Sequence, residues 1–363
     1  MALRSSSYSK SQVNIDSFRL ITVIGHGYYG KITLAQKLDT EELYAIKTVH
    51  KKRLIDFDRI HTAICERKVL TECHHPFIIS LYYAFQTSSK FYFCLEFVPG
   101  GELFKHMQEC GTLPIPEVKL YIAEISLALD YLHSLGVIYR DLKPENVLLD
   151  AQGHVKLTDF GLCKNLLDQS MTSTFCGTNE YLAPEVISHS EYSFEIDFWA
   201  LGILMYEMLV GDTPFNSQNR NLMFKRILTS EIEFDPDFDP NAQSLIEGLL
   251  EKDPKKRIGF NEIKKHKFFE GIDWDKVYNK QTRPLYVPPL NEMGVCSNEY
   301  EGETPMDSLV TPINSSLVHL NDFSFAKDDI LTPIYTDEAN GLASLTIDNY
   351  LADSESDEAN TRN

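Results

Sequence analysis

The first stretch of the chain that could carry out chemistry is rich in glycine. It reads Gly25-His26-Gly27-Tyr28-Tyr29-Gly30-Lys31. This spacing fits the G-x-G-x-x-G pattern of dinucleotide-binding folds and nearly fits the phosphate-binding loop that ends in Gly-Lys-Ser/Thr. Both of those sites need a helix directly after the glycines, because its N-terminus faces the phosphates. A third interpretation is a glycine-rich β-turn whose backbone N–H groups approach phosphate oxygens.

The residues after the glycines favour the third interpretation. Ile32-Thr33-Leu34-Ala35 is an alternating run that predicts a strand rather than a helix. Ile32 also stands where a phosphate-binding loop would need Ser or Thr to hold magnesium. On its own, the stretch is as compatible with an ordinary glycine-rich hairpin as with a nucleotide site.

Charged and amide side chains further along the chain support a nucleotide site. Lys47 lies on the second predicted strand after the glycines, and Glu66 follows 19 residues later in a predicted helix. Asp141, Asn146 and Asp159 add carboxylate and amide oxygens, which are ligands that suit magnesium. These residue types predict phosphoryl transfer, which needs positioning and charge neutralisation more than covalent chemistry.

The order and spacing of these residues match the protein-kinase signature. The matching blocks are Tyr44-Ala45-Ile46-Lys47, Tyr139-Arg140-Asp141, Asp159-Phe160-Gly161 and Ala183-Pro184-Glu185. From about Phe18 to Phe325 the chain resembles a serine/threonine kinase of the AGC group, and within it protein kinase B, the serum- and glucocorticoid-regulated kinase and the ribosomal-protein kinases. Tyr139 and the runs 159–164 and 174–178 carry this closer resemblance. Only about 17 residues precede the kinase region, so we expect no N-terminal lipid-binding domain.

The resemblance implies an active, non-specific serine/threonine protein kinase that uses ATP and Mg²⁺. Asp141 would orient the substrate hydroxyl and accept its proton, and Lys143 would neutralise the γ-phosphate. Lys47, held by Glu66, would pair with the α- and β-phosphates. The metal would be held by Asn146 and Asp159. The nucleotide would contact Ile24, Gly25, His26, Gly27, Tyr28, Tyr29, Gly30, Lys31, Ile32, Ala45, Lys47, Glu96, Val98 and Leu148.

The same resemblance implies protein substrates with arginines before the phosphorylated Ser or Thr. Glu102, Glu145 and Glu207 stand at positions whose carboxylates bind those arginines. A carboxylate pairs with a guanidinium through two hydrogen bonds, which favours Arg over Lys. Asn179 replaces the proline expected after Thr178, so the loop that meets the residue after the phosphorylation site differs from the family pattern.

Regulatory phosphorylation by upstream kinases is implied at three sites. Thr174 would carry the activation-loop phosphate and meet Arg140 and Lys164. Ser324 lies in 320–325, which resembles the hydrophobic motif with Leu320 in place of the first Phe. Phe323 and Phe325 would fill a pocket beside the helix of Glu66, with Lys51 near the phosphate. The turn site is Ser308, with Thr304 and Thr311 as rivals because proline follows them.

Other positions are expected to play structural or coupling roles. Asp197 would tie down the catalytic loop, and Glu185 would form a buried ion pair with Arg257. A family histidine that contacts the Thr174 phosphate lies four residues before the Glu66 position, where this chain has Thr62, and His61 is one residue off. We therefore expect weak coupling from Thr174 to this helix. A disulfide between Cys163 and Cys176 is weighed against two inert thiols, which we favour.

The elements needed to position these residues follow from the periodicity. Strand patterns fill 18–50 and recur in IISLYYAF and FYFCLEFV, while 56–72 and 117–135 show helical spacing. We predict an α+β, two-lobed kinase fold whose small lobe has one regulatory helix. The predicted divisions are a short N-terminal segment (1–17), the small lobe (18–97), the large lobe (98–276), an AGC-type tail (277–326) and an acidic, disordered extension (327–363).

Composition excludes several other classes of protein. The net charge of -19 is concentrated in residues 291–363, which hold 15 Asp/Glu and 2 Lys/Arg, so nucleic-acid binding is disfavoured. The densest apolar run, Trp199–Val210, is 12 residues long, short of a membrane span of roughly 18. Seven scattered cysteines fit neither a disulfide framework nor a zinc site. We expect a cytoplasmic monomer, with access to the nucleus left open, and no direct membrane domain.

Two other classes of protein remain as rivals. A catalytically dead kinase fold that serves as a scaffold is weakened by the presence of Lys47, Glu66, Asp141, Asn146 and Asp159. A phosphate-binding-loop NTPase is weakened by Ile32 and by the strand pattern after the glycines.

Overall fold

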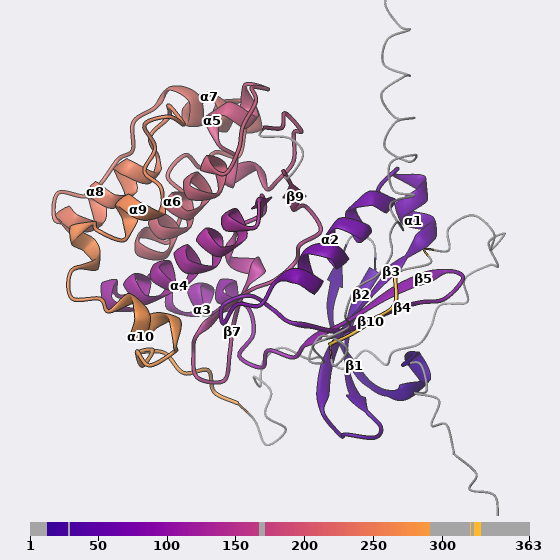
Figure 1. Ribbon diagram of the computed structural model, residues 1–363. Helices are drawn as coiled ribbons and strands as arrows, with labels where there is room; N and C mark the ends of the chain where they lie inside the picture. The colour runs from indigo at the N-terminus through magenta and orange to yellow at the C-terminus, as the bar shows by residue number, and fades with distance from the viewer. Residues whose placement is uncertain (1–12, 28–29, 167–170, 291–319, 321–322, 328–363) are drawn as a thin grey trace, which may run out of the picture. The chain divides into compact units, whose positions relative to one another are not determined.

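The computed structural model describes residues 13–27, 30–166, 171–290, 320 and 323–327. Figure 1 shows a β-sheet with helices α1 and α2 forming one lobe, and the remaining helices forming a second lobe. The two-lobed α+β fold predicted from the sequence is therefore confirmed. In the described part of the chain, no helix is long and apolar enough to cross a membrane.

The small lobe is built on a six-stranded antiparallel sheet in the order β1-β2-β3-β5-β4-β10. The 3-10 turn η1 (Ile15–Ser17) precedes the sheet. The strands are β1 (Phe18–Gly27), β2 (Gly30–Lys37), β3 (Leu43–His50), β4 (Leu81–Gln86), β5 (Lys90–Glu96) and β10 (Phe325–Ala326). Strand β10 belongs to the predicted tail, which returns to the sheet edge beside β4.

The central strand β5 is apolar from Phe91 to Leu95 because both of its faces are covered. Phe91, Phe93 and Leu95 face the main core, whereas Tyr92 and Cys94 face a second cluster with Phe18 and Tyr44. Successive side chains of a strand point to opposite faces, so a strand buried on both sides loses the usual alternation.

The small lobe carries two helices, not the one that was predicted over 56–72. Helix α1 (Lys51–Asp56) follows β3 directly, and α2 (Ile60–Glu72) begins after a break. Asp58 lies at the break with φ of 52°. A residue in the left-handed backbone conformation cannot continue a right-handed helix. The first helix therefore ends before Asp58, and the second begins at Ile60.

The large lobe is mainly helical. Its helices are α3 (Leu103–Cys110), α4 (Ile115–Ser134), α5 (Pro184–Ile187), α6 (Glu195–Val210), α7 (Arg220–Thr229), α8 (Pro240–Leu249), α9 (Phe260–Ile263) and α10 (Trp274–Tyr278). Its 3-10 turns are η2 (Pro144–Asn146), η3 (Asn179–Tyr181) and η4 (Lys267–Phe269). Two short strand pairs frame the loops between α4 and α5, namely β6 (Val137–Ile138) with β9 (Lys164–Asn165), and β7 (Val147–Leu149) with β8 (Val155–Leu157).

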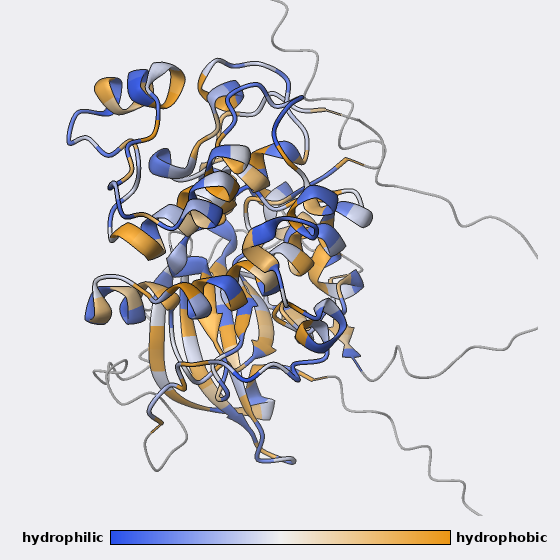
Figure 2. Cartoon of the chain, turned by 90° about the vertical axis from the view of Figure 1, so that its left-hand side faces the viewer, coloured by the Kyte–Doolittle hydropathy of each residue, from blue (hydrophilic) through white to orange (hydrophobic). Residues whose placement is uncertain are grey.

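Burial distinguishes the helices of this lobe. Helix α6 is apolar around most of its circumference and almost wholly buried, which marks it as the centre of the lobe. It packs against α4 and α8. The outer helices are striped with polar and apolar residues, as the alternating colours in Figure 2 show.

Candidate active site

Three charged side chains from different elements meet between the lobes. Lys47 on β3 places its Nζ 2.6 Å from Glu66 Oε1 on α2 and 2.9 Å from Asp159 Oδ1, which follows β8. Burial lowers the pKa of Lys47, but the charges of Asp159 and Glu66 outweigh burial and leave the pKa raised. The charge of Lys47 in turn lowers the pKa of Asp159. The triad is therefore a cation flanked by a buried carboxylate, that of Glu66, and a half-exposed one, that of Asp159.

The loop after β6 is held in an unusual backbone conformation by a buried aspartate. Asp197 on α6 accepts hydrogen bonds from the backbone N–H groups of Tyr139 and Arg140, each at 2.9 Å. His133 Nε2 lies 2.8 Å from the same carboxylate. Arg140 has φ of 69°, a conformation that costs free energy unless the surroundings fix it. The predicted role of Asp197 in tying down this loop is confirmed.

This loop presents Asp141 beside three polar side chains. Asn146 Nδ2 donates to Asp141 Oδ2 at 2.8 Å, and Lys143 Nζ lies 3.2 Å from the same oxygen. The hydroxyl of Thr178 donates to Asp141 Oδ1 at 3.1 Å and accepts from Lys143 Nζ at 3.0 Å. The sequence argument missed Thr178, although it lies in the run 174–178 that carried the resemblance.

The glycine stretch forms a hairpin between β1 and β2, as the third interpretation required. A Cβ on Gly30 would lie 1.6 Å from the carbonyl oxygen of Thr48, so packing of β2 on β3 demands glycine there. At Gly25 and Gly27 a Cβ would make only ordinary contacts of 3.6 and 3.9 Å. Packing does not explain these two glycines, and the space beside them suits an approaching ligand. Tyr28 and Tyr29 lie outside the described residues.

Apolar side chains line the region predicted to hold the adenine ring. Ala45 and Val98 are buried, while Ile24, Ile32 and Leu148 are half-buried against the core. Glu96 turns its side chain away to Lys156, with 2.8 Å between Oε2 and Nζ. Of the polar residues predicted to contact the nucleotide, Lys31 lies partly buried on β2 and His26 is exposed on β1.

The oxygens near Lys47 fit a magnesium ion. Asp159 offers a carboxylate with a lowered pKa, and Asn146 uses its amide nitrogen on Asp141, which leaves the amide oxygen to serve as a ligand. In the described part of the chain, no group of three or more His, Cys, Asp or Glu side chains could hold a metal alone. Magnesium is typically coordinated by one or two protein carboxylates, and water and substrate phosphates complete its coordination shell.

Acidic side chains gather at the edge of this site on the large lobe. Glu207 on α6 accepts a hydrogen bond from the hydroxyl of Tyr181. Burial raises the pKa of Glu207, and the negative charges of Glu145 and Glu180 raise it further. Glu145 is exposed in η2, which packs against α3 and its N-cap Glu102. The structure thus brings Glu145 near Glu207 and adds Glu180, which the sequence argument missed, while Glu102 stands at the start of α3.

Of the predicted phosphorylation sites, Thr174 and Ser324 lie among the described residues. Thr174 is exposed, its carbonyl accepts from the Tyr192 hydroxyl at 2.6 Å, and its Oγ1 lies 3.3 Å from Thr172 Oγ1. Lys164 Nζ donates to Thr172 Oγ1 at 2.9 Å, so this lysine lies one side chain away from Thr174. Ser308 and its rivals Thr304 and Thr311 lie outside the described residues.

The expectation that Thr62 stands where the family has a phosphate-contacting histidine stays a prediction. Thr62 uses its hydroxyl on the carbonyl of Arg59 at 2.7 Å, at the start of α2. Burial lowers the pKa of His61, the positive charges of Arg59, Arg140 and Lys164 lower it further, and the negative charge of Asp58 opposes them. The charges of Arg140 and Lys164 are therefore felt at His61, although Arg59 and Asp58 are the charged residues that act on it most. Both Thr62 and His61 lie in the first turn of α2, which begins at Ile60.

The tail returns to the small lobe and docks beside α2, as predicted. Phe323 is 2% exposed and packs on Phe91 and Phe93, with ring centroids 4.4 and 5.5 Å apart. Arg67, which directly follows Glu66 on α2, donates from Nε to the Phe323 carbonyl at 2.9 Å. Ser324 is exposed and Phe325 only half-buried in β10. Lys51 Nζ donates to Gln86 Oε1 at 2.8 Å, and Gln86 in turn bonds Leu320.

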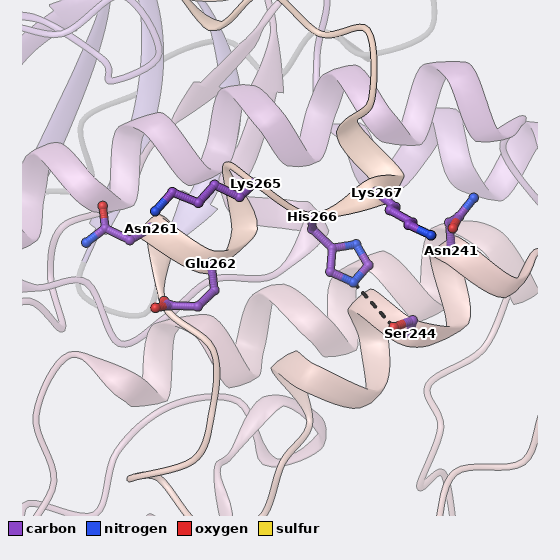
Figure 3. A pocket seen from close by; sticks show the side chains of 7 residues that line it. All are labelled: Asn241, Ser244, Asn261, Glu262, Lys265, His266 and Lys267. Carbon is purple, nitrogen blue, oxygen red and sulfur yellow. Dashed lines mark hydrogen bonds between the residues drawn. The ribbon is translucent and has the colours of Figure 1, made fainter.

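A separate hollow of about 500 Å³ opens on the large lobe between α8 and α9. Figure 3 shows its polar lining, in which His266 Nε2 lies 3.3 Å from Ser244 Oγ. None of the residues predicted to act in catalysis lines it. The chemistry of the side chains, and not the size of a hollow, therefore locates the candidate active site at Lys47, Asp141 and Asp159.

A two-lobed fold with these residues between its lobes defines a protein kinase. The family model for the protein kinase domain matches residues 18–269, and the chain belongs to this family. The AGC-type resemblance predicted from the sequence is confirmed.

Curated relatives carry the comparison further. The chain is 47% identical over 280 residues to the serine/threonine-protein kinase Sgk1 of Xenopus tropicalis, covering 76% of this chain and 67% of that protein. It is 44% identical over 305 residues to the serine/threonine-protein kinase gad8 of Schizosaccharomyces pombe, covering 82% and 54%. It is 45% identical over 280 residues to the RAC family serine/threonine-protein kinase homolog of Dictyostelium discoideum, covering 76% and 63%. The chain thus spans between about half and two thirds of the length of these relatives.

Proposed function

We propose that this protein is an ATP-dependent serine/threonine protein kinase that transfers the γ-phosphoryl group to Ser or Thr in Arg-rich motifs. The observation that carries the proposal is the triad in which Lys47 and Glu66 of the small lobe meet Asp159 of the large lobe, the lobe that also holds Asp141. The proposal is supported by the relatives gad8 and Sgk1, which are named serine/threonine-protein kinases. A dead scaffold has no need to keep all of these side chains in place.

Each side chain has a role that follows from its surroundings. Lys47, already charged and held by Glu66, binds α- and β-phosphate oxygens of ATP. Asp159 and Asn146 hold Mg²⁺, which when bound neutralises phosphate charge in the transition state. Asp141 orients the substrate hydroxyl and takes its proton, while Lys143 meets the γ-phosphate from the same loop. Thr178 fixes Lys143 and Asp141 relative to one another.

The direct test is phosphorylation of an Arg-rich serine peptide by the purified chain with magnesium and ATP. We expect phosphoserine product with the wild-type chain and none above background without magnesium. A chain that binds ATP but yields no phosphopeptide, whatever the sequence of the peptide, would favour the scaffold alternative.

We expect the acids at the site edge to select arginine. Changing Glu145 to Gln should lower kcat/KM for a peptide with arginines before the serine by roughly 10-fold to 100-fold, because a charge-assisted pair contributes about 1.5 to 3 kcal/mol. A peptide with leucine in place of those arginines should lose nothing further. Glu270→Gln, which changes an exposed carboxylate outside the acidic cluster, is the matched control. Equal losses on both peptides would argue against arginine recognition.

The docked tail supports a proposal of activation in cis. We infer that Phe323 and the Arg67 contact steady α2 and with it the Lys47–Glu66 pair. Phe323→Ala removes a buried ring, a change that costs about 3 to 5 kcal/mol in protein cores, and should lower kcat by about tenfold or more through loss of docking. A separate peptide that contains residues 318–327 should restore part of the activity.

The control for tail docking is another phenylalanine of the same lobe. Phe57 is 52% exposed, so Phe57→Ala should leave kcat within about twofold of wild type because little apolar surface is lost. Equal activity of the Phe323→Ala variant and the wild type, in the absence of added peptide, would contradict activation by the tail.

A further inference from the structure

Two cysteines from distant parts of the chain face each other beside the active site. Cys65 Sγ on α2 lies 3.7 Å from Cys163 Sγ, which precedes β9 in the activation segment. Cys65 Sγ also lies 3.6 Å from the carbonyl oxygen of Cys163. Among the described residues, the sulfur contact of Cys163 is with Cys65, and no such contact joins Cys163 to Cys176. The Cys163–Cys176 pairing that was weighed from the sequence, and not favoured, therefore has no sulfur contact, and both thiols are free.

The two thiols have different surroundings. Cys65 is half-buried, so a small oxidant can reach it, whereas Cys163 is buried. The hydrogen bond from the Cys163 thiol lowers the pKa of Cys65 to about 7, with help from the Asn165 backbone N–H and the charge of Arg140. The pKa of Cys163 is raised by its bond to Cys65 and by burial. This asymmetry gives a thiolate that attacks first and a neighbour that resolves the product.

We propose that Cys65 and Cys163 form a reversible intrachain disulfide with hydrogen peroxide as the oxidant. The Cys65 thiolate attacks one peroxide oxygen, so an S–O bond forms, the O–O bond breaks and hydroxide leaves as water. Cys163 sulfur then attacks Cys65 sulfur, which forms the S–S bond, breaks the S–O bond and releases a second water. Two thiols together lose two electrons and two protons, and one peroxide is reduced to two waters.

The position of the pair gives the disulfide a consequence, which rests on the proposed kinase function. Cys65 directly precedes Glu66, and the sulfurs lie 3.7 Å apart while Glu66 holds Lys47. A bond of about 2.05 Å needs only a small closing movement from this arrangement. The disulfide therefore fastens α2 to the activation segment with the Lys47–Glu66 pair formed, which is the same task as that inferred for the docked tail.

The test of the disulfide does not depend on activity. The full chain is treated with hydrogen peroxide, alkylated, digested and analysed by mass spectrometry. We expect a linked peptide pair that contains Cys65 and Cys163, lost on reduction with dithiothreitol and absent in Cys65→Ser and Cys163→Ser. Cys176→Ser is the control and should retain the link. A link between Cys163 and Cys176, or two free thiols at Cys65 and Cys163 while peroxide oxidises other cysteines, would overturn the proposal.

A second measurement tests the consequence. Peroxide should raise the thermal unfolding midpoint of the wild type, because the link closes a loop across 98 residues of sequence, and should leave that of Cys65→Ser unchanged. In the Phe323→Ala background, oxidation should restore at least half of the lost kcat, and Cys65→Ser should abolish this rescue. Oxidised protein that is linked but shows no rescue would contradict the fastening role. The disulfide mapped by mass spectrometry would still hold, because that measurement does not depend on kinase activity.

Discussion

Asp141→Asn is expected to lower kcat by about 10²-fold to 10⁴-fold, the usual contribution of a positioned proton acceptor. Asparagine keeps the size of the side chain and can still bond Thr178, but it cannot take a proton from the substrate hydroxyl. Its amide also meets the amide of Asn146 and the ammonium of Lys143, which now lie beside an uncharged group. Affinity for magnesium-ATP should stay within about twofold of wild type, because Asp141 is not placed on the nucleotide phosphates.

The measurement is kcat with an Arg-rich peptide alongside nucleotide affinity by calorimetry. Asp159→Asn is the contrasting variant, because it removes a charge that lies 2.9 Å from Lys47 and is placed to hold the metal. It should weaken magnesium-ATP binding as well as turnover. Thermal unfolding of each variant shows whether the fold is retained. Wild-type turnover in both variants would refute the assignment of the active site.

Arg257→Ala is expected to lower the free energy of unfolding by about 3 to 5 kcal/mol, as removal of one partner from a buried ion pair does. Arg257 Nη1 and Nη2 donate to the two carboxylate oxygens of Glu185 at 2.6 and 2.9 Å, which confirms the predicted pair. The same guanidinium bonds the carbonyls of Glu195 and Glu251. Alanine leaves the Glu185 carboxylate buried without its counter-ion and removes one donor from each of the two carbonyls.

Urea unfolding followed by circular dichroism provides the measurement. Lys256→Ala is the matched control, because its ammonium lies 3.8 Å from Asp253 and 72% of its side chain is exposed. A surface pair of this kind contributes at most about 1 kcal/mol. Replacing Glu185 and Arg257 together by apolar residues should recover part of the loss, since no unpaired charge then remains. A change of less than about 1 kcal/mol in Arg257→Ala would show that water replaces the lost partner.

The local pattern of residues determined the elements and the identity of the chemistry. Alternation after the glycines predicted the β1–β2 hairpin and excluded a helix there, and the hairpin is present. Spacing of Lys47, Glu66, Asp141 and Asp159 predicted a site that the fold assembles. Such features are readable because strand and helix periods and turn residues act over a few neighbours along the chain. The division between α1 and α2 was missed because the pattern over 56–72 carries no signal for the left-handed Asp58.

Only the tertiary structure decided which side chains meet across long stretches of sequence. It brought Thr178 to Asp141, placed Glu180 where its charge acts on Glu207, and set Cys65 against Cys163. Each of these depends on how distant segments pack and on the direction of the side chains, which changes by about 100° per residue along a helix. Such directions are set by packing between lobes and by the returning tail, so no local pattern of residues encodes them.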